Sequence, residues 1–166
     1  MIYCPKCANT LIERPVDGSV RKTCSLPECG FVHWDNPIPG VAGLVQYDNN
    51  IILARNTKWP GGLFSIITGF LEKNEMPEAA VARELKEELG LECDVQALIG
   101  HYPFPEMNQI LIAYWLNGSG NLNLGEEIAE TKIVSLDSLK HYDFTPLYLT
   151  EKIVKDWFQV LPISKK

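Results

Sequence analysis

Hydrophobic and polar positions along this chain form two kinds of pattern, one typical of strands and the other of helices. Short runs rich in β-branched and aromatic residues, bounded by Gly, Pro, Asn or Asp, indicate β-strands. The first two runs flank a polar turn at 48–50 and therefore predict a β-hairpin. The strands expected from these runs are 41–47, 51–55, 63–68, 93–99, 109–116 and 132–136.

Two further stretches have the spacing of amphipathic helices. Pro77 suits the first turn of one helix, where no backbone donor is needed, and Gly90 suits the left-handed residue that ends it. A second helix is expected at 145–158. Strands mixed with helices in this order predict an α/β sandwich. The apolar stripe that packs the first helix on a core comprises Val81, Ala82, Leu85 and Leu89.

The polar face of the first helix carries a cluster of carboxylates. Glu84, Glu87 and Glu88 stand at i, i+3 and i+4, so their side chains are neighbours on a helix. Their charges repel one another, and Arg83 and Lys86 neutralise only part of that repulsion. A solvated acidic surface is the simplest alternative. Hard oxygen ligands grouped in this way instead favour a site for Mg²⁺ or Mn²⁺.

The residues around this cluster resemble the sequence box of the Nudix hydrolases. The chain reads Gly69, five residues, Glu75, seven residues, and then R-E-L-K-E-E-L-G-L. Fixed spacing over so long a stretch seldom arises by chance. The resemblance implies a Nudix α/β/α sandwich with a mixed sheet. It also implies an enzyme that uses divalent metal ions to hydrolyse nucleoside diphosphates linked to another group.

The same resemblance implies roles for individual residues of the box. Glu75 and Arg83 are expected to pair and to brace the loop against the helix. The carbonyl group of Gly69 is expected to bind the metal ions together with the three clustered glutamates. The catalytic residues implied in this way are Glu75, Arg83, Glu84, Glu87 and Glu88.

One metal ligand is expected from outside the box. Among the glutamates of the segment 125–130, Glu127 is preferred over Glu126 and Glu130, because Glu-Ile just before a late strand matches the place where relatives carry this ligand. The general base stays open, since Nudix enzymes use different residues for it, and Glu84 is one candidate.

The N-terminal stretch predicts a separate metal-binding module. Four of the five cysteines lie in the first 30 residues, as the pairs Cys4–Cys7 and Cys24–Cys29. Each pair can direct two thiolates at one tetrahedral Zn²⁺, whereas a reducing cytosol would not maintain disulfides. The module resembles a zinc ribbon, and four thiolates leave no open position for catalysis. We expect a structural zinc ribbon at 1–36 and a Nudix hydrolase domain at 37–166.

Net charge and the first residues of the chain indicate which partners and which cellular location to expect. The formal net charge is −6, which argues against nucleic acid or an anionic membrane as the partner. The chain opens with no signal-peptide pattern and no long apolar run, so a cytoplasmic protein is expected. The expected partner is a small-molecule nucleotide, and the resemblance adds a homodimer as a further expectation.

The identity of the nucleotide is less closely specified. A zinc ribbon ahead of a Nudix domain, and Phe70 directly after the box glycine, resemble the NADH pyrophosphatase branch, in which an aromatic residue at that position stacks on a base. Part of a later signature of that branch also matches, at residues 103–105. The aromatic residues expected to line a base pocket are Trp34, Phe70, Tyr102 and Phe104.

Several functions therefore stay open. The first is hydrolysis of NADH or NAD to nicotinamide mononucleotide and AMP, and the second is hydrolysis of ADP-ribose or an ADP-sugar. Removal of an NAD cap from RNA is a further alternative. A Nudix domain that senses a ligand without catalysis is the non-enzymatic alternative, and the intact glutamate cluster argues against it.

Overall fold

The structure, a computed structural model, describes residues 1–160 of the 166-residue chain. Its internal contacts divide the chain into one unit from Met1 to Pro37 and another from Ile38 onward. The predicted Nudix domain extends to residue 166, so its end, residues 161–166, lies outside the described part. No helix within residues 1–160 is long and apolar enough to cross a membrane.

The N-terminal unit is a small antiparallel sheet built around cysteines. Strands β1 (Leu11–Val16), β2 (Ser19–Cys24) and β3 (Val32–His33) pair in the order β1-β2-β3, and a 3₁₀ turn (Pro27–Cys29) precedes β3. Three of its buried residues are cysteines, and only Leu11 and Phe31 pack against them. So little apolar surface cannot offset the entropy of ordering the chain, and units of this kind normally depend on metal binding.

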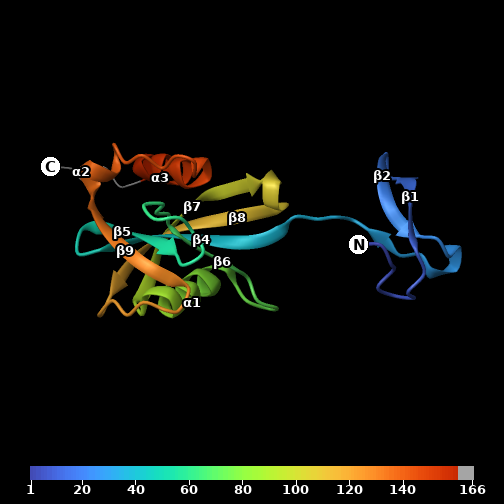
Figure 1. Ribbon diagram of the computed structural model, residues 1–166, viewed down its shortest axis with the longest axis horizontal. Helices are drawn as coiled ribbons and strands as arrows, with labels where there is room; N and C mark the ends of the chain where they lie inside the picture. Colours follow the sequence, from blue (N-terminus) through green and yellow to red (C-terminus); the bar gives the residue numbers. More distant parts are fainter. Residues whose placement is uncertain (161–166) are drawn as a thin grey trace. The chain divides into compact units, whose positions relative to one another are not determined.

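The second unit contains a mixed β-sheet. Strand β4 pairs in parallel with β8, and the other strand pairs are antiparallel. The strand order is β7-β8-β4-β5-β9, with β6 paired to the first half of β4 (Figure 1). The strands are β4 (Ile38–Tyr47), β5 (Asn50–Asn56), β6 (Ile67–Phe70), β7 (Glu92–Phe104), β8 (Gln109–Ser119) and β9 (Ile128–Ser135).

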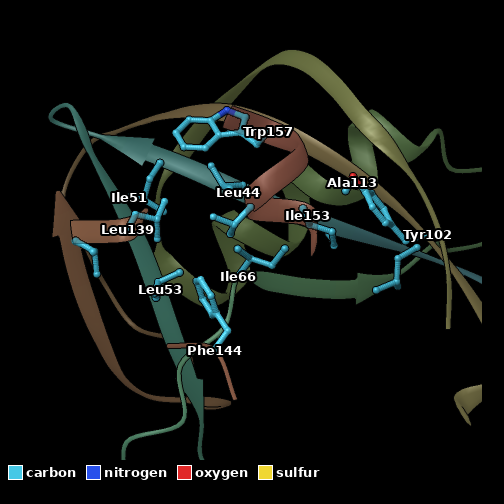
Figure 2. Packing of buried hydrophobic residues seen from close by; sticks show 14 residues of the cluster. Leu44, Ile51, Leu53, Ile66, Tyr102, Ala113, Leu139, Phe144, Ile153 and Trp157 are labelled. Atoms are coloured by element: carbon cyan, nitrogen blue, oxygen red, sulfur yellow. The ribbon is translucent and has the colours of Figure 1, made fainter. Parts of the chain in front are cut away.

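Helices cover both faces of this sheet, so the second unit is the expected α/β/α sandwich (Figure 1). Helix α1 (Pro77–Leu89) packs on one face and α3 (Tyr148–Val160) on the other, while α2 (Leu136–Leu139) is a single turn after β9. Figure 2 shows the core beneath α3, where Trp157 is fully buried. Burying a large apolar side chain stabilises a fold by about 1.5–3 kcal/mol.

Most of the expected elements are present, with shifts in their limits. The hairpin of β4 and β5 and the helix ended by Gly90, whose φ is 72°, are confirmed. The strand expected at 63–68 is instead Ile67–Phe70, because the chain makes only a single bridge from Ser65 to β5 and then pairs with β4. The last helix begins at Tyr148, after Pro146, rather than at 145.

Candidate active site

Helix α1 positions the carboxylate cluster through its apolar face. Val81, Leu85 and Leu89 are fully buried against the sheet. Because residues three and four apart share a helix face, this packing turns Glu84, Glu87 and Glu88 toward a cavity at the end of β6. The three glutamates are therefore held by a rigid element rather than by a loop.

Strand β6 lies close to the helix at Gly69, where the side chain of Glu84 approaches the backbone. A Cβ atom built on Gly69 would overlap the carboxyl group of Glu84. This contact brings the backbone of the predicted metal ligand Gly69 directly against the predicted metal ligand Glu84. The box glycine thus lets Glu84 keep this position, since a larger residue would make its side chain turn away.

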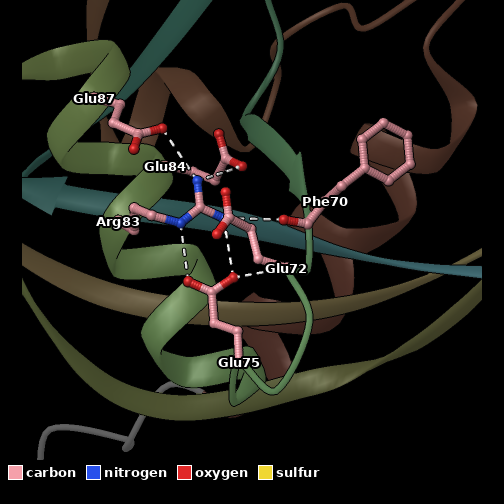
Figure 3. A network of polar contacts seen from close by, with 6 residues as sticks. All are labelled: Phe70, Glu72, Glu75, Arg83, Glu84 and Glu87. Atoms are coloured by element: carbon pink, nitrogen blue, oxygen red, sulfur yellow. Dashed lines mark hydrogen bonds and ion pairs between the residues drawn. The ribbon is translucent and has the colours of Figure 1, made fainter.

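Arg83 is the centre of a polar network that joins the loop after β6 to α1 (Figure 3). Its guanidinium group donates two hydrogen bonds to Glu75, at 2.9 and 3.0 Å, and one to the carbonyl oxygen of Phe70 at 3.0 Å. The hydrogen bonds raise the pKa of Arg83, and the arginine lowers the pKa of Glu75. The expected pairing of Glu75 with Arg83 is present in this structure, and it braces the loop.

The same guanidinium group also contacts the carboxylate cluster. It donates to Glu84 Oε1 at 3.0 Å and to Glu87 Oε2 at 3.1 Å. Within residues 1–160, no three of these glutamates bring one carboxylate oxygen each within 4.8 Å of one another. The glutamates share one face and one cavity, and an arginine lies between two of them.

Burial and mutual repulsion disfavour the charged form of two of these glutamates. Burial raises the pKa of Glu84, although Arg83 opposes the shift. Burial, followed by the charges of Glu84, Glu127 and Glu87, raises the pKa of Glu88 to about 7. A divalent cation would relieve the same repulsion, because oxygen ligands and negative charge are what Mg²⁺ and Mn²⁺ require.

A loop after β8 brings a fourth carboxylate to the cluster. The backbone N–H groups of Asn123 and Gly125 donate to the last carbonyl groups of α1, at 2.8 and 2.9 Å. A Cβ atom on Gly125 would overlap the carbonyl oxygen of Glu87, so this close approach requires glycine. The loop then places Glu126 and Glu127 on the cavity wall.

The three glutamates of this segment have different surroundings. The charge of Glu127 acts on Glu88, and its carboxylate accepts a long hydrogen bond of 3.5 Å from Asn56. Glu130 instead forms an ion pair with Arg55 at 2.6 Å. Glu127 therefore lies beside the cluster and Glu130 is paired with Arg55, while the role of Glu127 as a metal ligand stays a prediction.

The cavity has a volume of about 640 Å³ and two chemically different walls. The carboxylates form one wall, and aromatic and apolar groups from β6, β7 and the start of α3 form the other. Phe70 and Phe104 line it as expected, and the ring of Phe70 projects away from the arginine network (Figure 3). Residues that the sequence reasoning missed also line it: Trp59, Gln109, Tyr148 and Thr150.

Among the expected aromatic residues of the second unit, Tyr102 does not line this cavity, and the place of Trp34 stays a prediction. Tyr102 is buried in the core beneath α3, where its hydroxyl group donates to Asp156 at 2.8 Å. It shares its face of β7 with Phe104, but α3 covers it, with Lys152 over its ring at 5.6 Å. Trp34 belongs to the N-terminal unit, where Arg21 stacks on its ring at 4.8 Å.

The four N-terminal cysteines form a compact thiol cluster that could hold a metal ion. Their sulfur atoms all lie within 4.8 Å of one another, with Cys4–Cys29 at 3.7 Å and Cys7–Cys24 at 3.4 Å. Tetrahedral zinc with bonds of about 2.3 Å separates its sulfur ligands by about 3.8 Å, whereas a disulfide bond is about 2.05 Å. The cluster therefore fits a zinc site, and all four thiols are free.

The cysteines differ in their readiness to bind as thiolates. Hydrogen bonds from Asn9 lower the pKa of the exposed Cys7 to about 6. Burial raises the pKa of Cys24 to about 12 and also raises that of Cys29. A bound cation would stabilise the buried thiolates directly.

A mixed sheet between helices, with an arginine-braced loop and a glutamate-rich helix at one cavity, defines the class of Nudix pyrophosphohydrolases. The NUDIX domain model matches residues 37–158, and the chain belongs to this family. The N-terminal cysteine unit lies ahead of the matched residues.

Known relatives carry two kinds of name. The chain is 34% identical over 130 residues to an ADP-ribose pyrophosphatase of Methanocaldococcus jannaschii, and this covers 75% of each chain. It is 29% identical over 120 residues to the NAD-capped RNA hydrolase NudC of Vibrio atlanticus, covering 72% of this chain and 43% of the relative. The chain thus spans less than half the length of that relative.

Solved structures share the fold at low sequence identity. A NUDIX hydrolase from Nitrosomonas europaea aligns with a TM-score of 0.79 at 22% identity, covering 96% of this chain and 91% of the other. An ADP-ribose pyrophosphatase from Streptococcus suis aligns with a TM-score of 0.59 at 20% identity, over 75% of this chain and 91% of the other. Both likenesses show the Nudix fold.

Proposed function

We propose that this chain hydrolyses the pyrophosphate bond of an adenosine diphosphate that is linked to a second group. The observation that carries the proposal is the lining of one cavity, with a group of carboxylates on one wall and aromatic rings on the other. The first wall suits metal-bound phosphates, and the second suits the flat faces of a base. Both halves of a nucleotide can thus be held in one place.

The chain's own residues supply the environment for this reaction. The groups proposed to hold Mg²⁺ or Mn²⁺ are Glu84, Glu87, Glu88, Glu127 and the carbonyl group of Gly69. When bound, such ions neutralise phosphate oxygens and lower the pKa of coordinated water. Arg83 fixes the loop that follows Gly69 and contacts Glu87, whose side chain is 58% exposed and can turn away from it. The general base is not assigned.

Two substrates fit this proposal. NADH or NAD is the first, supported by Phe70 on the cavity wall and by the relatives named NAD-capped RNA hydrolase. ADP-ribose is the second, favoured by the Methanocaldococcus relative, of which the chain covers 75%. Both compounds contain adenosine diphosphate, so the proposal rests on the part that they share.

The N-terminal unit has a structural role in this proposal. Cys4, Cys7, Cys24 and Cys29 would hold one Zn²⁺ ion, which would supply the stability that the small apolar core lacks. A cytoplasmic location and a homodimer stay predictions.

Product analysis tests the proposed function. The purified protein is incubated with Mg²⁺ or Mn²⁺ and, separately, NADH, NAD, ADP-ribose, ADP-glucose and nucleoside triphosphates. Release of AMP together with nicotinamide mononucleotide or ribose 5-phosphate supports the proposal and identifies the substrate. Turnover of triphosphates alone, or of none of these compounds, would contradict it.

A further inference from the structure

An unpartnered amide lies beside an aromatic ring on the cavity wall. Gln109, the first residue of β8, stands directly opposite Phe104, the last residue of β7, in the antiparallel register. Directly opposed residues project from the same face of a sheet, and both line the cavity. Within residues 1–160, the side-chain amide of Gln109 makes no hydrogen bond, although it is half-buried.

A second ring borders the same corner and is held at both ends. Tyr148, the first residue of α3, packs edge-on against Phe104, with the ring centroids 6.4 Å apart and the planes at 78°. Its hydroxyl group donates to Glu106 Oε2 at 2.7 Å. Packing and this hydrogen bond fix the orientation of the ring. Tyr148 nevertheless stays half-exposed on the cavity wall.

We propose that Phe104, Tyr148 and Gln109 form the subsite for the adenine base, and that Gln109 determines its specificity. This inference rests on the proposed function and names the part of the cavity that selects the nucleotide. The rings would bind the faces of the base, as aromatic side chains do for any base. Gln109 would read its edge.

The chemistry of the amide explains the choice of adenine. A carboxamide presents one acceptor and one donor side by side. Adenine presents the matching pair, an amine donor next to a ring-nitrogen acceptor, and glutamine pairs with it through two hydrogen bonds. ADP-ribose and NAD, the compounds in the names of the relatives, both carry this base. The amide of Gln109 has no partner within the described residues, so its donor and acceptor are both available to a ligand.

Binding of two nucleotides tests the role of Gln109 without any turnover. AMP and purine riboside 5′-monophosphate differ only in the exocyclic amine, and titration calorimetry measures both. The wild-type protein should bind AMP about tenfold more tightly. Gln109→Leu should bind both equally, at the weaker of the two affinities. Gln109→Glu, which keeps the size but loses the donor, should also bind AMP more weakly than the wild type does.

Two further variants separate this subsite from its surroundings. Tyr148→Ala should weaken both nucleotides by the same factor, since the ring contacts the face and not the edge of the base. Gln96→Leu is the matched control, because Gln96 is exposed on β7 and does not line the cavity. It should change neither affinity.

The outcomes distinguish this inference from the proposed function. If Gln109→Leu keeps the wild-type preference for AMP, Gln109 does not read the base and the inference is wrong, even where ADP-ribose is hydrolysed. If the preference for AMP depends on Gln109 but no diphosphate is hydrolysed, the adenine subsite is supported and the proposed activity is refuted. Equal binding of both nucleotides by the wild type would also overturn the inference.

Discussion

Glu88 links the stability of the protein to the function of its site. Its pKa is raised from 4.5 to about 7 in the folded protein, mainly by burial and then by three neighbouring carboxylates. Folding therefore disfavours the charged form. Glu88 contributes most to stability below pH 4.5, and this contribution is lost as the pH rises through about 7. Replacing the acid with a neutral amide should remove that loss.

The magnitude follows from the interval between the two pKa values. The interval between 4.5 and about 7 corresponds to about 3 kcal/mol at most. Because Glu88 is only half-buried, solvent screening reduces this to about 1–2 kcal/mol. For a protein of this size, such a change raises the melting temperature by about 3–6 °C.

The assay compares wild-type protein with Glu88→Gln by thermal unfolding at pH 5, 7 and 8.5 without added divalent metal. The variant should be more stable at pH 8.5, and the two proteins should converge at pH 5. Added Mg²⁺ should raise the melting temperature of the wild type but hardly that of the variant. Glu92→Gln is the control, since Glu92 is exposed and lies outside the cavity.

Either of two results would refute this reasoning. One is a variant that is less stable than the wild type at pH 8.5 in the absence of metal, which would show that charged Glu88 is favourable in the folded state. The other is equal stabilisation of both proteins by Mg²⁺, which would show that Glu88 is not a metal ligand.

Three further predictions test the surroundings of the site. Gly125→Ala should lower turnover about tenfold or more, because the added Cβ pushes the Glu127 loop away from α1; steady-state kinetics would show this, and unchanged kcat would contradict it. Arg83→Lys should lower the free energy of unfolding by about 1–3 kcal/mol in denaturant titrations, because lysine cannot reproduce the paired bonds to Glu75; an unchanged midpoint would count against it. Cys24→Ser should release zinc, measured by elemental analysis, and retained zinc would refute the metal site.

Local patterns in the sequence were enough to predict the framework of the site. Helix α1 begins at Pro77 and ends before Gly90 as expected, because these residues fix backbone geometry locally. The same is true of the hairpin, whose turn residues Asp48 and Asn49 have positive φ angles. The spacing of the glutamates then placed them on one helix face without any tertiary information.

The second wall of the cavity depends on contacts between segments far apart in the chain. Tyr148 and Gln109 belong to different elements, and nothing in their neighbourhoods indicates that both approach Phe104. Tyr102 shows the opposite case, since its place beside a Pro-rich segment suggested a pocket, but α3 covers it in the core. Phe104 lies on the same face of β7, so the position of α3, which the local sequence does not indicate, separates the two residues.

The central claim is that the glutamates of α1 hold the metal ions that hydrolyse a nucleotide pyrophosphate. The most direct test measures Mg²⁺-dependent release of AMP from ADP-ribose and NADH by the wild type, Glu87→Gln and the control Glu92→Gln. Glu87→Gln should lose more than about 100-fold in turnover, since even indirect partners of a metal ion are worth about 10–100-fold, while its melting curve and the activity of the control stay unchanged. Wild-type turnover in a folded Glu87→Gln protein would contradict the claim.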